Sequence, residues 1–537
     1  MKIIRTAVLS TTWLLPLTLA AVFLSAQLNT ADILGTVTDA AGAVMPNAKV
    51  TIVNKNTADT RTTQTGGSGD YVVNLLPSGA YTVTVEAPSF KRFSSTVTLV
   101  AGDRARIDAS LQVGDTTQTV EVSASAPALQ TDSSTLRDTV SAQSVQDLPL
   151  NGRNFVNLVT TTVGAAAAPS NSIIGGTRPD ERRQTAGVVA NGMNETFNNH
   201  LVDGMDNNER EQFSILIRPS IDSIQEVKVD TNAFPAEVGR AGGAVVNLIT
   251  KSGGNALHGG VYEYFRNDKL NANDFFGNAG GIGRPEFRQN QFGGSLGGHI
   301  VKDKTFFFGD FEELRQIQGK NTGLLAAPTA YELTHPGDFS DVGGPIVPPS
   351  QIDPVALKYL ALLPAANIPG APPTANYTGN VNNQYYARTI DARIDHRWSD
   401  KDSSFGRFSY NPTTTVYPTL YPKVNGVNPG NGIYPGNSTG DAQSYMLDHV
   451  HVFSPTVVLE VKSSFTRLNI ATLSANQGTN LSDKFGIPGA NVNPEVSGLL
   501  NVGINGYTGQ GSCNTLGDCT SVPIYDINKI MTGIGKQ

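Results

Sequence analysis

Cysteine is nearly absent from this chain, with two among 537 residues. So low a count excludes a disulfide-stapled scaffold and a zinc module built on cysteine ligands. Charge is also scarce, because only 16% of the residues are charged, the formal net charge is −7 and no basic block of five or more occurs. Nucleic-acid binding therefore lacks its electrostatic footprint, and no partner of that class is predicted.

Long apolar runs are missing as well, apart from one at the N-terminus. Lys2 and Arg5 precede an apolar stretch from Ala7 to Leu24, and a small residue then leads into polar sequence. This order is typical of a secretory signal, so residues 1–26 are predicted to be a signal peptide cut near Ala26. A single membrane anchor is the alternative, which the proline and threonines of the run disfavour. Because no later stretch reaches the ~18 apolar residues of a spanning helix, the chain can cross a membrane only as a β-barrel.

Glycine is abundant, with 55 residues, and short apolar–polar alternations recur along the chain. Between residues 32 and 113, turn residues separate several of these alternating segments. The segments are Ile33–Thr38, Ala48–Asn54, Thr60–Thr65, Tyr71–Leu75, Tyr81–Glu86, Ser94–Val100 and Ile107–Val113. Strands at this spacing predict a β-sandwich of about eighty residues.

Two stretches of this sandwich resemble the carboxypeptidase regulatory-like domain, which has a transthyretin-like fold. They are GTVTDAAGAVMPNAKVTI (Gly35–Ile52) and GDYVVNLLPSGAYTVTV (Gly69–Val85). The resemblance implies no peptidase, because that activity belongs to a separate zinc domain and no His-x-x-Glu pair occurs among the seven histidines. Related sandwiches often bind carbohydrate, which is an analogy at the level of the fold.

The stretch Pro219–Lys251 organises the centre of the chain. It predicts two apolar strands, Ile221–Val229 and Ala244–Thr250, which a glycine-rich connection joins and which are covered on both faces. Its ending, VNLITK, resembles the last part of the plug domain of TonB-dependent outer-membrane receptors. Residues 145–154 and 191–207 are similar to plug segments of the Oar-like branch of that family.

One turn of the plug-like region gathers oxygen-bearing side chains. Asp203 and Gly204 predict a tight turn, and Asp206, Asn207 and Glu209 follow it. Oxygen ligands of this kind suit a hard cation. They lack the alternating spacing of an EF-hand loop, so a solvated turn is the preferred prediction.

A short β-prone segment, Thr119-Val120-Glu121-Val122, lies between the sandwich and the plug-like region. An extended segment in this place can add a strand to a partner's sheet. In the resembled family such a segment, the TonB box, is pulled by the energising protein TonB. The resemblance thus implies a TonB contact at Thr119, Val120, Glu121 and Val122, and a plain first strand of the plug is the alternative.

Beyond Asn255 the alternation is typical of a membrane barrel. The segments are Leu257–Asn267, Phe287–Ile300, Thr305–Leu314, Tyr385–Trp398, Ser403–Asn411, Ser444–Phe453 and Val457–Leu468. In Tyr386–Trp398, Ile390 and Ile394 share one face with the terminal aromatics. The charged residues of the other face are Asp391, Arg393, Asp395 and Arg397. A face so rich in charge cannot point into lipid, and we predict that it lines a watery lumen.

Most of these segments are about 10 residues long or slightly longer, which is the reach of a tilted strand across the hydrocarbon core. Short turns alternate with long connections, Gln316–Asn383 and Pro412–Ala442, which predicts periplasmic turns and outer-surface loops. The stretches RNDKLNANDFF, RQNQFGGSLGGHI and KDKTFFFGDFEELRQ resemble the opening barrel strands of Oar-like receptors.

Three further patterns are considered as functional sites, and none of them is predicted to be catalytic or to bind a metal. Gly293–Gly297 satisfies G-x-S-x-G, but Ser295 lies inside an alternating strand and not at a strand-to-helix turn. His449 and His451 share a strand face with no third ligand in view. Cys513 and Cys519 bracket a short polar stretch and are predicted to form a loop disulfide in an oxidising periplasm, with free thiols as the alternative.

The sequence therefore predicts a mainly β protein: a transthyretin-like sandwich, a mixed α/β plug and the first part of a large antiparallel transmembrane barrel. The predicted units are a signal peptide at 1–26, the sandwich at 27–113, the plug at 114–252 and the barrel at 253–537. The resemblance implies a TonB-dependent receptor of the outer membrane that takes up a bulky solute, such as an oligosaccharide, a peptide or a metal chelate. Its partners would be TonB with the inner-membrane energising complex, and outer-membrane lipid.

No enzyme activity, catalytic residue, cofactor or metal site is predicted. The alternative function is a non-transporting surface protein that binds carbohydrate or mediates adhesion. A plugged barrel of 22 strands needs more strands than are counted after Asn255, so the chain is expected to be a fragment or a truncated product.

Overall fold

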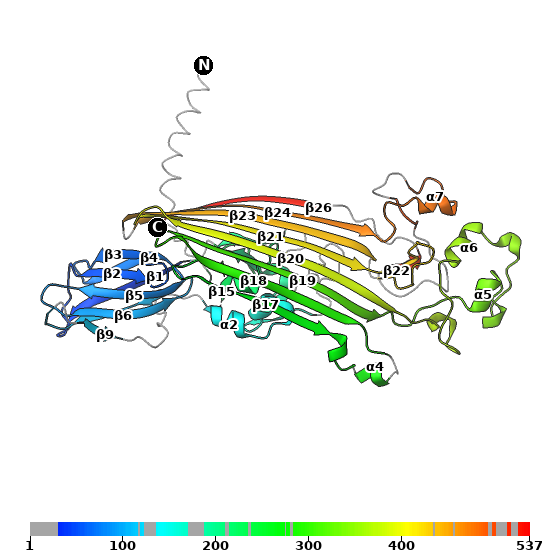
Figure 1. Ribbon diagram of the computed structural model, residues 1–537, viewed down its shortest axis with the longest axis horizontal. Helices are drawn as coiled ribbons and strands as arrows, with labels where there is room; N and C mark the ends of the chain where they lie inside the picture. The colour runs from blue at the N-terminus through cyan, green and yellow to red at the C-terminus, as the bar shows by residue number, and fades with distance from the viewer. Residues whose placement is uncertain are drawn as a thin grey trace, which may run out of the picture.

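The computed structural model groups the strands into a sandwich, a plug and a curved wall, which follow one another along the chain (Figure 1). The described residues are 30–115, 119–122, 136–169, 187–209, 214–232, 234, 238–273, 275–279, 283–432, 435–454, 457–491, 497–500, 513–516 and 525–536. The predicted signal peptide lies outside these ranges. Among the described residues, no helix has both the length and the apolar character needed to cross a membrane.

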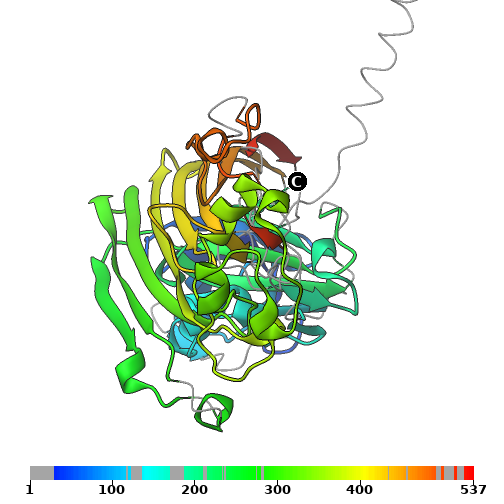
Figure 2. The ribbon, with the colours of Figure 1, turned by 90° about the vertical axis from the view of Figure 1, so that its right-hand side faces the viewer.

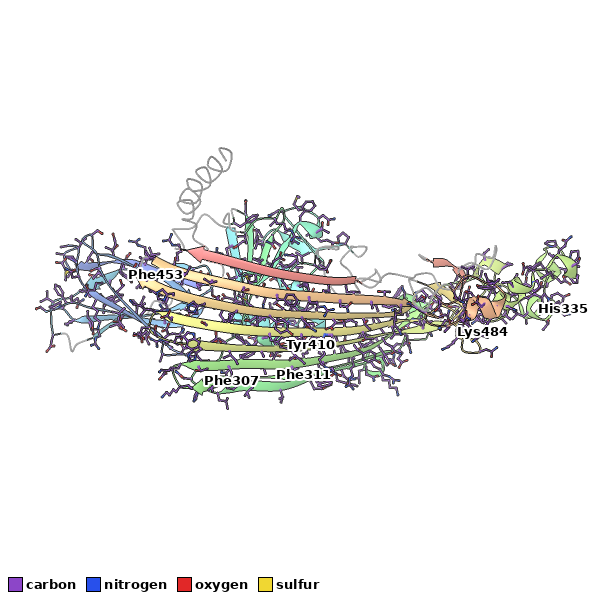
Figure 3. The ribbon with its side chains drawn as sticks, turned by 90° about the horizontal axis from the view of Figure 1, so that it is seen from above. Phe307, Phe311, His335, Tyr410, Phe453 and Lys484 are labelled. Carbon is purple, nitrogen blue, oxygen red and sulfur yellow. The ribbon has the colours of Figure 1, made fainter. Side chains whose placement is uncertain are left out.

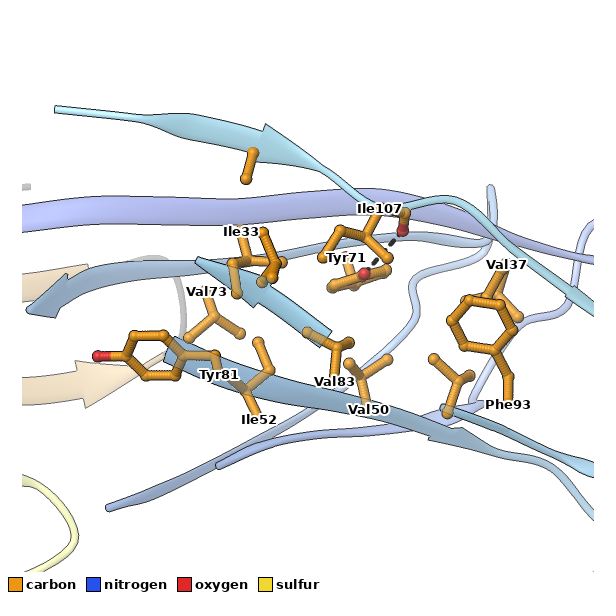
Figure 4. Close-up of a cluster of buried hydrophobic side chains, with 14 of the residues drawn as sticks. Ile33, Val37, Val50, Ile52, Tyr71, Val73, Tyr81, Val83, Phe93 and Ile107 are labelled. Carbon is orange, nitrogen blue, oxygen red and sulfur yellow. Dashed lines mark hydrogen bonds between the residues drawn. The ribbon is translucent and has the colours of Figure 1, made fainter. Parts of the chain in front are cut away.

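The sandwich consists of two sheets, of order β4-β1-β7 with β8 on β1, and of order β3-β2-β5-β6-β9. Its strands are β1 (Thr30–Asp39), β2 (Lys49–Asn54), β3 (Thr60–Gln64), β4 (Asp70–Pro77), β5 (Gly79–Glu86), β6 (Arg92–Leu99), β7 (Arg104–Arg106), β8 (Ala109–Leu111) and β9 (Thr119–Val122). Alternate residues point between the sheets, where Ile33, Ile52 and Phe93 form a common core (Figure 4). The hydroxyl of Tyr71 donates to the carbonyl of Ile107 over 2.8 Å, which satisfies a buried polar group in that core.

The plug is built on a mixed sheet of order β10-β15-β16-β13-β14 and a small sheet of β11 and β12. Its elements are β10 (Leu136–Val140), α2 (Ala142–Asp147), η1 (Asn151–Arg153), α3 (Val156–Val159), β11 (Ala165–Ala167), β12 (Val188–Ala190), η3 (Glu195–Phe197), β13 (Asn199–Val202), β14 (Met205–Asp206), η4 (Ile221–Ser223), β15 (Ile224–Asn232) and β16 (Val245–Thr250). The two predicted apolar strands are confirmed as β15 and β16, and both are buried on both faces. The first begins three residues later than predicted, because Ser220 caps the short helix η4.

The wall is a single sheet of antiparallel neighbours, ordered β17-β18-β19-β20-β21-β23-β24-β26. Its elements are β17 (His258–Asn267), η5 (Asp268–Leu270), α4 (Phe275–Ala279), β18 (Phe287–Val301), β19 (Thr305–Asn321), β20 (Asn380–Arg397), β21 (Asp402–Tyr417), β23 (Gly436–Ser454), β24 (Val457–Ser474) and β26 (Tyr525–Lys536). Seen end-on, the wall curves around the plug as an open trough (Figure 2). The predicted fold class is confirmed.

The outer face of the wall is apolar along the middle of its strands. Val261 is 90% exposed, Leu447 59% and Ile394 53%. Figure 3 shows Phe307 and Phe453 near the sandwich, with Phe311 farther along the strands. Apolar side chains exposed on one face of a curved antiparallel sheet form the surface that lipid covers in a membrane barrel.

Two expectations about the wall are wrong. The wall strands run for 15 to 19 residues in β18, β19, β20, β21, β23 and β24, instead of about 10 or slightly more, because they continue past the hydrocarbon zone into the long connections. The charged face of β20 does not line open water. Asp391, Arg393 and Arg397 on this face contact the plug or the sandwich.

The long connections pack together at the end of the wall opposite the sandwich (Figure 1). Their elements are α5 (Ala330–Thr334), η6 (Ser340–Val342), η7 (Pro349–Gln351), α6 (Pro354–Leu360), η8 (Pro373–Ala375), β22 (Gly430–Gly432), α7 (Leu481–Phe485) and β25 (Cys513–Leu516). Leu325 and Tyr359 of the connection between β19 and β20 share one apolar core with Tyr421 of the connection between β21 and β23. The hydroxyl of Tyr421 donates to the carbonyl of Ala326 over 2.6 Å. We call this packed unit the outer loop module.

Candidate functional site: the plug–wall contact

The first part of the plug–wall contact is the turn that joins β13 to β14. Asp203 and Gly204 have φ of 50° and 77°, as a tight hairpin turn with two left-handed central residues requires. The predicted turn is thus confirmed, but its predicted solvation is wrong. Asp203 is 1% exposed and Glu209 is also 1% exposed, because the wall covers this edge of the plug sheet.

Asp203 ties the plug to two strands of the wall. Within the plug, its carboxylate accepts hydrogen bonds from the N–H and the hydroxyl of Thr250, over 3.0 and 2.9 Å. Across the contact, Arg407 Nε lies 3.0 Å from Asp203 Oδ2, and an Arg393 guanidinium nitrogen lies 3.7 Å from Oδ1. Arg393 is itself held over the ring of Phe405, 3.8 Å from its centroid. Asp203 is thus the carboxylate paired with Arg407, and it shares Arg393 with Asp395, which lies 2.8 Å from that guanidinium.

A second part of the contact pairs plug hydroxyls with wall carboxyls. Ser220 Oγ donates to Asp310 of β19, and Ser223 Oγ donates to Asp391 of β20 over 3.1 Å. Asp310 and Asp391 are cross-strand neighbours, and both are less than a tenth exposed. Ser220 caps the short helix η4 and Ser223 is its last residue, so the turn that begins the central hairpin of the plug is also the turn that touches the wall.

A third part of the contact is centred on Arg153, in one of the segments that resemble the Oar-like plug. Gly152 and Arg153 both have positive φ, and this backbone directs the guanidinium toward the wall. Arg153 lies 2.6 Å from Asp222 of the plug and 3.0 Å from Glu312 of β19. It also sits over the ring of Tyr262 of β17, 4.3 Å from the centroid. Planar, delocalised charge suits this arrangement of two carboxylates and an aromatic face.

Replacing Arg153 by lysine is expected to weaken the seating of the plug by roughly 1–3 kcal/mol, because an ammonium cannot reach both carboxylates and stack on the ring. The measurement is the urea concentration at which trypsin begins to cleave the plug in outer-membrane preparations. Arg288→Lys is the matched control, since Arg288 is 57% exposed and pairs with Glu286 on the surface. An equal shift in both variants would contradict the assignment.

These three parts of the contact are polar, and a small apolar part lies beside them, where Leu216 and Ile217 of the plug pack against Ala442, Leu468 and Ile470 of the wall. Ion pairs and hydroxyl–carboxyl bonds can exchange for bonds to water when two surfaces separate, whereas an apolar contact cannot. The polar parts therefore hold the plug in one position and still allow it to move, and the apolar surface that separation would expose is confined to the cluster around Leu216 and Ile217. Nothing in it resembles a nucleophile with its base.

Two protein families match the chain over its sandwich and its wall. The carboxypeptidase regulatory-like domain matches residues 32–112, and the outer membrane beta barrel domain matches residues 249–532. The chain belongs to the outer membrane beta barrel family. Its predicted location in the outer membrane is confirmed.

The chain is 28% identical to the TonB-dependent transporter Oar of Myxococcus xanthus over 297 residues, which are 52% of this chain and 26% of Oar. Similar solved structures include the outer membrane transporter YddB from Escherichia coli, with a TM-score of 0.43 and 12% identity over 64% of this chain and 40% of YddB. The ferric enterobactin receptor PfeA from Pseudomonas aeruginosa has a TM-score of 0.38 and 13% identity over 64% of this chain and 42% of PfeA. The predicted resemblance to Oar-like receptors is confirmed, and the chain spans about a quarter of the length of Oar.

In this outer-membrane protein the segment predicted to contact TonB, Thr119–Val122, is strand β9. It pairs in parallel with Arg92–Ser95 of β6 and lies at the end of the five-stranded sheet of the sandwich. It is therefore not paired within the plug sheet, and the sandwich sheet extends past residue 113. The TonB contact itself stays a prediction.

The other singled-out residues fall at scattered places. Ser295 lies within β18, opposite Gly260 and Asp310. His449 and His451 contact Ser404 and Asp402 on neighbouring β21, and no metal-binding group of three His, Cys, Asp or Glu occurs among the described residues. The predicted disulfide stays a prediction, because Cys519 and the side chain of Cys513 lie outside the described part of the chain.

A separate buried network joins the sandwich to the plug, and we call it the sandwich–plug latch. The N–H of Ala101 donates to Glu226 of β15 over 2.7 Å. Arg137 of β10 donates to the carbonyl of Gly102 over 2.7 Å and pairs with Asp230 over 2.8 Å. Burial and, to a smaller extent, Asp103 raise the pKa of Glu226 to about 7, although the Ala101 N–H, Lys228 and Arg137 oppose the rise.

The sandwich–plug latch is expected to weaken as the pH rises. Glu226 has an ordinary pKa near 4.3 when unfolded and about 7 when folded, so the folded state holds an extra proton between these values. Stability is therefore full below about pH 4.3 and falls by on the order of 3 kcal/mol as the pH passes 7. Thermal unfolding in detergent micelles from pH 4 to 8 measures this loss of stability. Glu226→Gln keeps the hydrogen-bond acceptor and should make the melting temperature depend less on pH. An unchanged slope in that variant would contradict the assignment.

Proposed function

We propose that this chain is part of a TonB-dependent transporter that takes up a bulky solute across the outer membrane. The observation that carries the proposal is a plug seated inside a lipid-facing wall mostly by polar contacts, at Asp203, Ser220–Ser223 and Arg153, with one small apolar cluster around Leu216 and Ile217. A permanent stopper would gain more from apolar packing. A plug that must move and return gains from contacts that water can replace.

The solute would first meet the plug on the side of the outer loop module. A cavity of ≈ 120 Å³ lies there between plug and wall, and Arg218, Tyr385 and Asn411 are among its lining residues. Guanidinium, phenol and amide groups offer hydrogen bonds and one aromatic face to an oligosaccharide, a peptide or a metal chelate. The apolar core of the outer loop module supports a preformed binding platform.

Energy would enter from the periplasm, since an outer membrane holds no nucleotide supply. Among the described strands, β9 is the last of its sheet, and its outer edge would take a strand of TonB, with main-chain hydrogen bonds supplying the affinity. Val120→Pro removes an N–H and should abolish uptake while leaving solute binding unchanged. Val113→Pro, which precedes β9, is the matched control.

The test is an uptake screen in cells with and without TonB, using fluorescent maltoheptaose, a fluorescent nonapeptide and a ferric hydroxamate chelate. We expect at least one probe to enter only when TonB and the protein are both present. Binding of maltoheptaose at the surface with no entry of any probe would favour the carbohydrate-binding alternative and contradict the proposal.

A further inference from the structure

The sandwich lies at the end of the wall where short turns join the strands, opposite the outer loop module (Figure 1). Two contacts tie it to the start and to the rim of the wall. The N–H of Asn255, just before β17, donates to the carbonyl of Asn56 over 2.9 Å, and Arg397 Nε lies 3.2 Å from Asp59. Asn56 and Asp59 belong to the turn between β2 and β3. This turn is therefore the part of the sandwich that touches the wall.

A cavity of ≈ 250 Å³ lies where the sandwich, the plug and the wall meet. The sandwich contributes Asp59 to its lining, the plug contributes Asp203 and Thr250, and the wall contributes Arg393 and Phe405. Asp203, Thr250 and Arg393 are also members of the plug–wall contact. The cavity thus continues that contact toward the sandwich, and a solute that moves between plug and wall would arrive at the turn between β2 and β3.

The sandwich is attached in this position by polar contacts. Apart from the two wall contacts, the described attachment is the sandwich–plug latch, in which backbone groups of Ala101 and Gly102 meet charged plug side chains. Contacts between domains that are few and polar behave like transient interfaces, so relative motion is the default expectation. The attachment suits a unit that docks and releases.

We propose that the sandwich is a gate on the periplasmic side of the transporter. Docked, its turn between β2 and β3 closes the cavity where plug and wall part, and release opens the exit. This inference rests on the proposed transport function and adds the device that regulates the solute's exit.

One pair of positions allows the docked state to be trapped. A Cβ built on Gly254 would lie 3.7 Å from the Cβ of Asn56, and nothing else crowds it closer than the Asn56 carbonyl at 3.4 Å. Disulfides need Cβ atoms about 3.5–4.5 Å apart. The double variant Asn56→Cys with Gly254→Cys therefore traps the sandwich on the wall when oxidised. The single variants control for reaction with Cys513 and Cys519.

The experiment follows the rate at which copper phenanthroline cross-links this pair in whole cells. We expect rapid cross-linking after a protonophore and a roughly tenfold slower reaction in energised cells, where the docked state becomes a minority. Thr51→Cys with Thr84→Cys is the matched control, because these residues face each other on β2 and β5 within the sandwich. The cross-linking rate of this control pair should be the same in energised and in protonophore-treated cells.

Equal rates for Asn56→Cys with Gly254→Cys in both conditions would overturn the gate, since the sandwich would then be a fixed part of the structure. Entry of the three screening probes through the oxidised pair at the wild-type rate would also overturn it, while leaving the transporter intact. If no probe enters even through the reduced protein, the transport proposal fails instead. The cross-linking rates then still decide whether the sandwich releases.

Discussion

Replacing Asp203 by alanine is expected to lower the stability of the seated plug by roughly 3–5 kcal/mol. The substitution leaves Arg407 buried without its carboxylate partner, whereas Arg393 keeps Asp395, and it removes the acceptor for Thr250. An uncompensated buried charge costs more than the pair contributed, so the effect exceeds that of an ordinary lost hydrogen bond. Trypsin cleavage of the plug against urea concentration, in outer-membrane preparations, measures the change.

Asp400→Ala is the control for this substitution. Asp400 also pairs with an arginine, Arg397, but it is 88% exposed, and a surface pair of this kind contributes little. We expect no measurable shift in its urea midpoint. If Asp203→Ala also left the urea midpoint unchanged, the plug–wall contact would not be what holds the plug.

Replacing Leu447 by arginine is expected to destabilise the inserted wall by about 2–4 kcal/mol and to reduce the folded protein in the outer membrane. Leu447 projects from the outer face of β23 and is 59% exposed. If Leu447 faced water, this substitution would hardly change the stability of the folded protein. A loss of folded protein would therefore show that lipid surrounds this position. The measurement is the folded fraction in isolated outer membranes.

Asn437→Arg is the matched control for Leu447→Arg, because Asn437 projects from the same face of β23 at the end near the outer loop module. A charge beyond the hydrocarbon costs at most about 1 kcal/mol. Equal accumulation of the two variants would contradict a lipid-covered outer face.

Much of the fold could be predicted because alternation is a local property of a strand. Each apolar–polar segment of the sandwich and wall marks a strand with one buried or lipid-facing side, whatever its neighbours are. The continuous apolar run from Val245 to Thr250 likewise indicated a strand covered on both faces, and β16 is one. The lengths of the wall strands were underestimated because their outer ends carry little apolar alternation, as in Gly436–Gly440 of β23.

The plug–wall contact could not be predicted in the same way. The Asp203–Gly204 pair determines a turn, but its burial depends on Arg393 and Arg407, which lie about two hundred residues further along the chain. The charges on the inner face of β20 were visible in the sequence, and their position in mid-strand was the available signal. A watery lumen and a charged partner both satisfy such a face, and only the fold shows that the plug occupies it.

The central claim is that the eight-stranded sheet from β17 to β26, without β22 and β25, forms a lipid-embedded wall around the plug. Spin labels placed one at a time from Gln443 to His449 on β23, in outer membranes, test it through their accessibility to oxygen and to a nickel chelate. The account predicts alternation, with oxygen favoured at residues 443, 445, 447 and 449, which project outward, and low access to both reagents at 444, 446 and 448, which face the plug. Uniform access of the nickel chelate along the strand would contradict it.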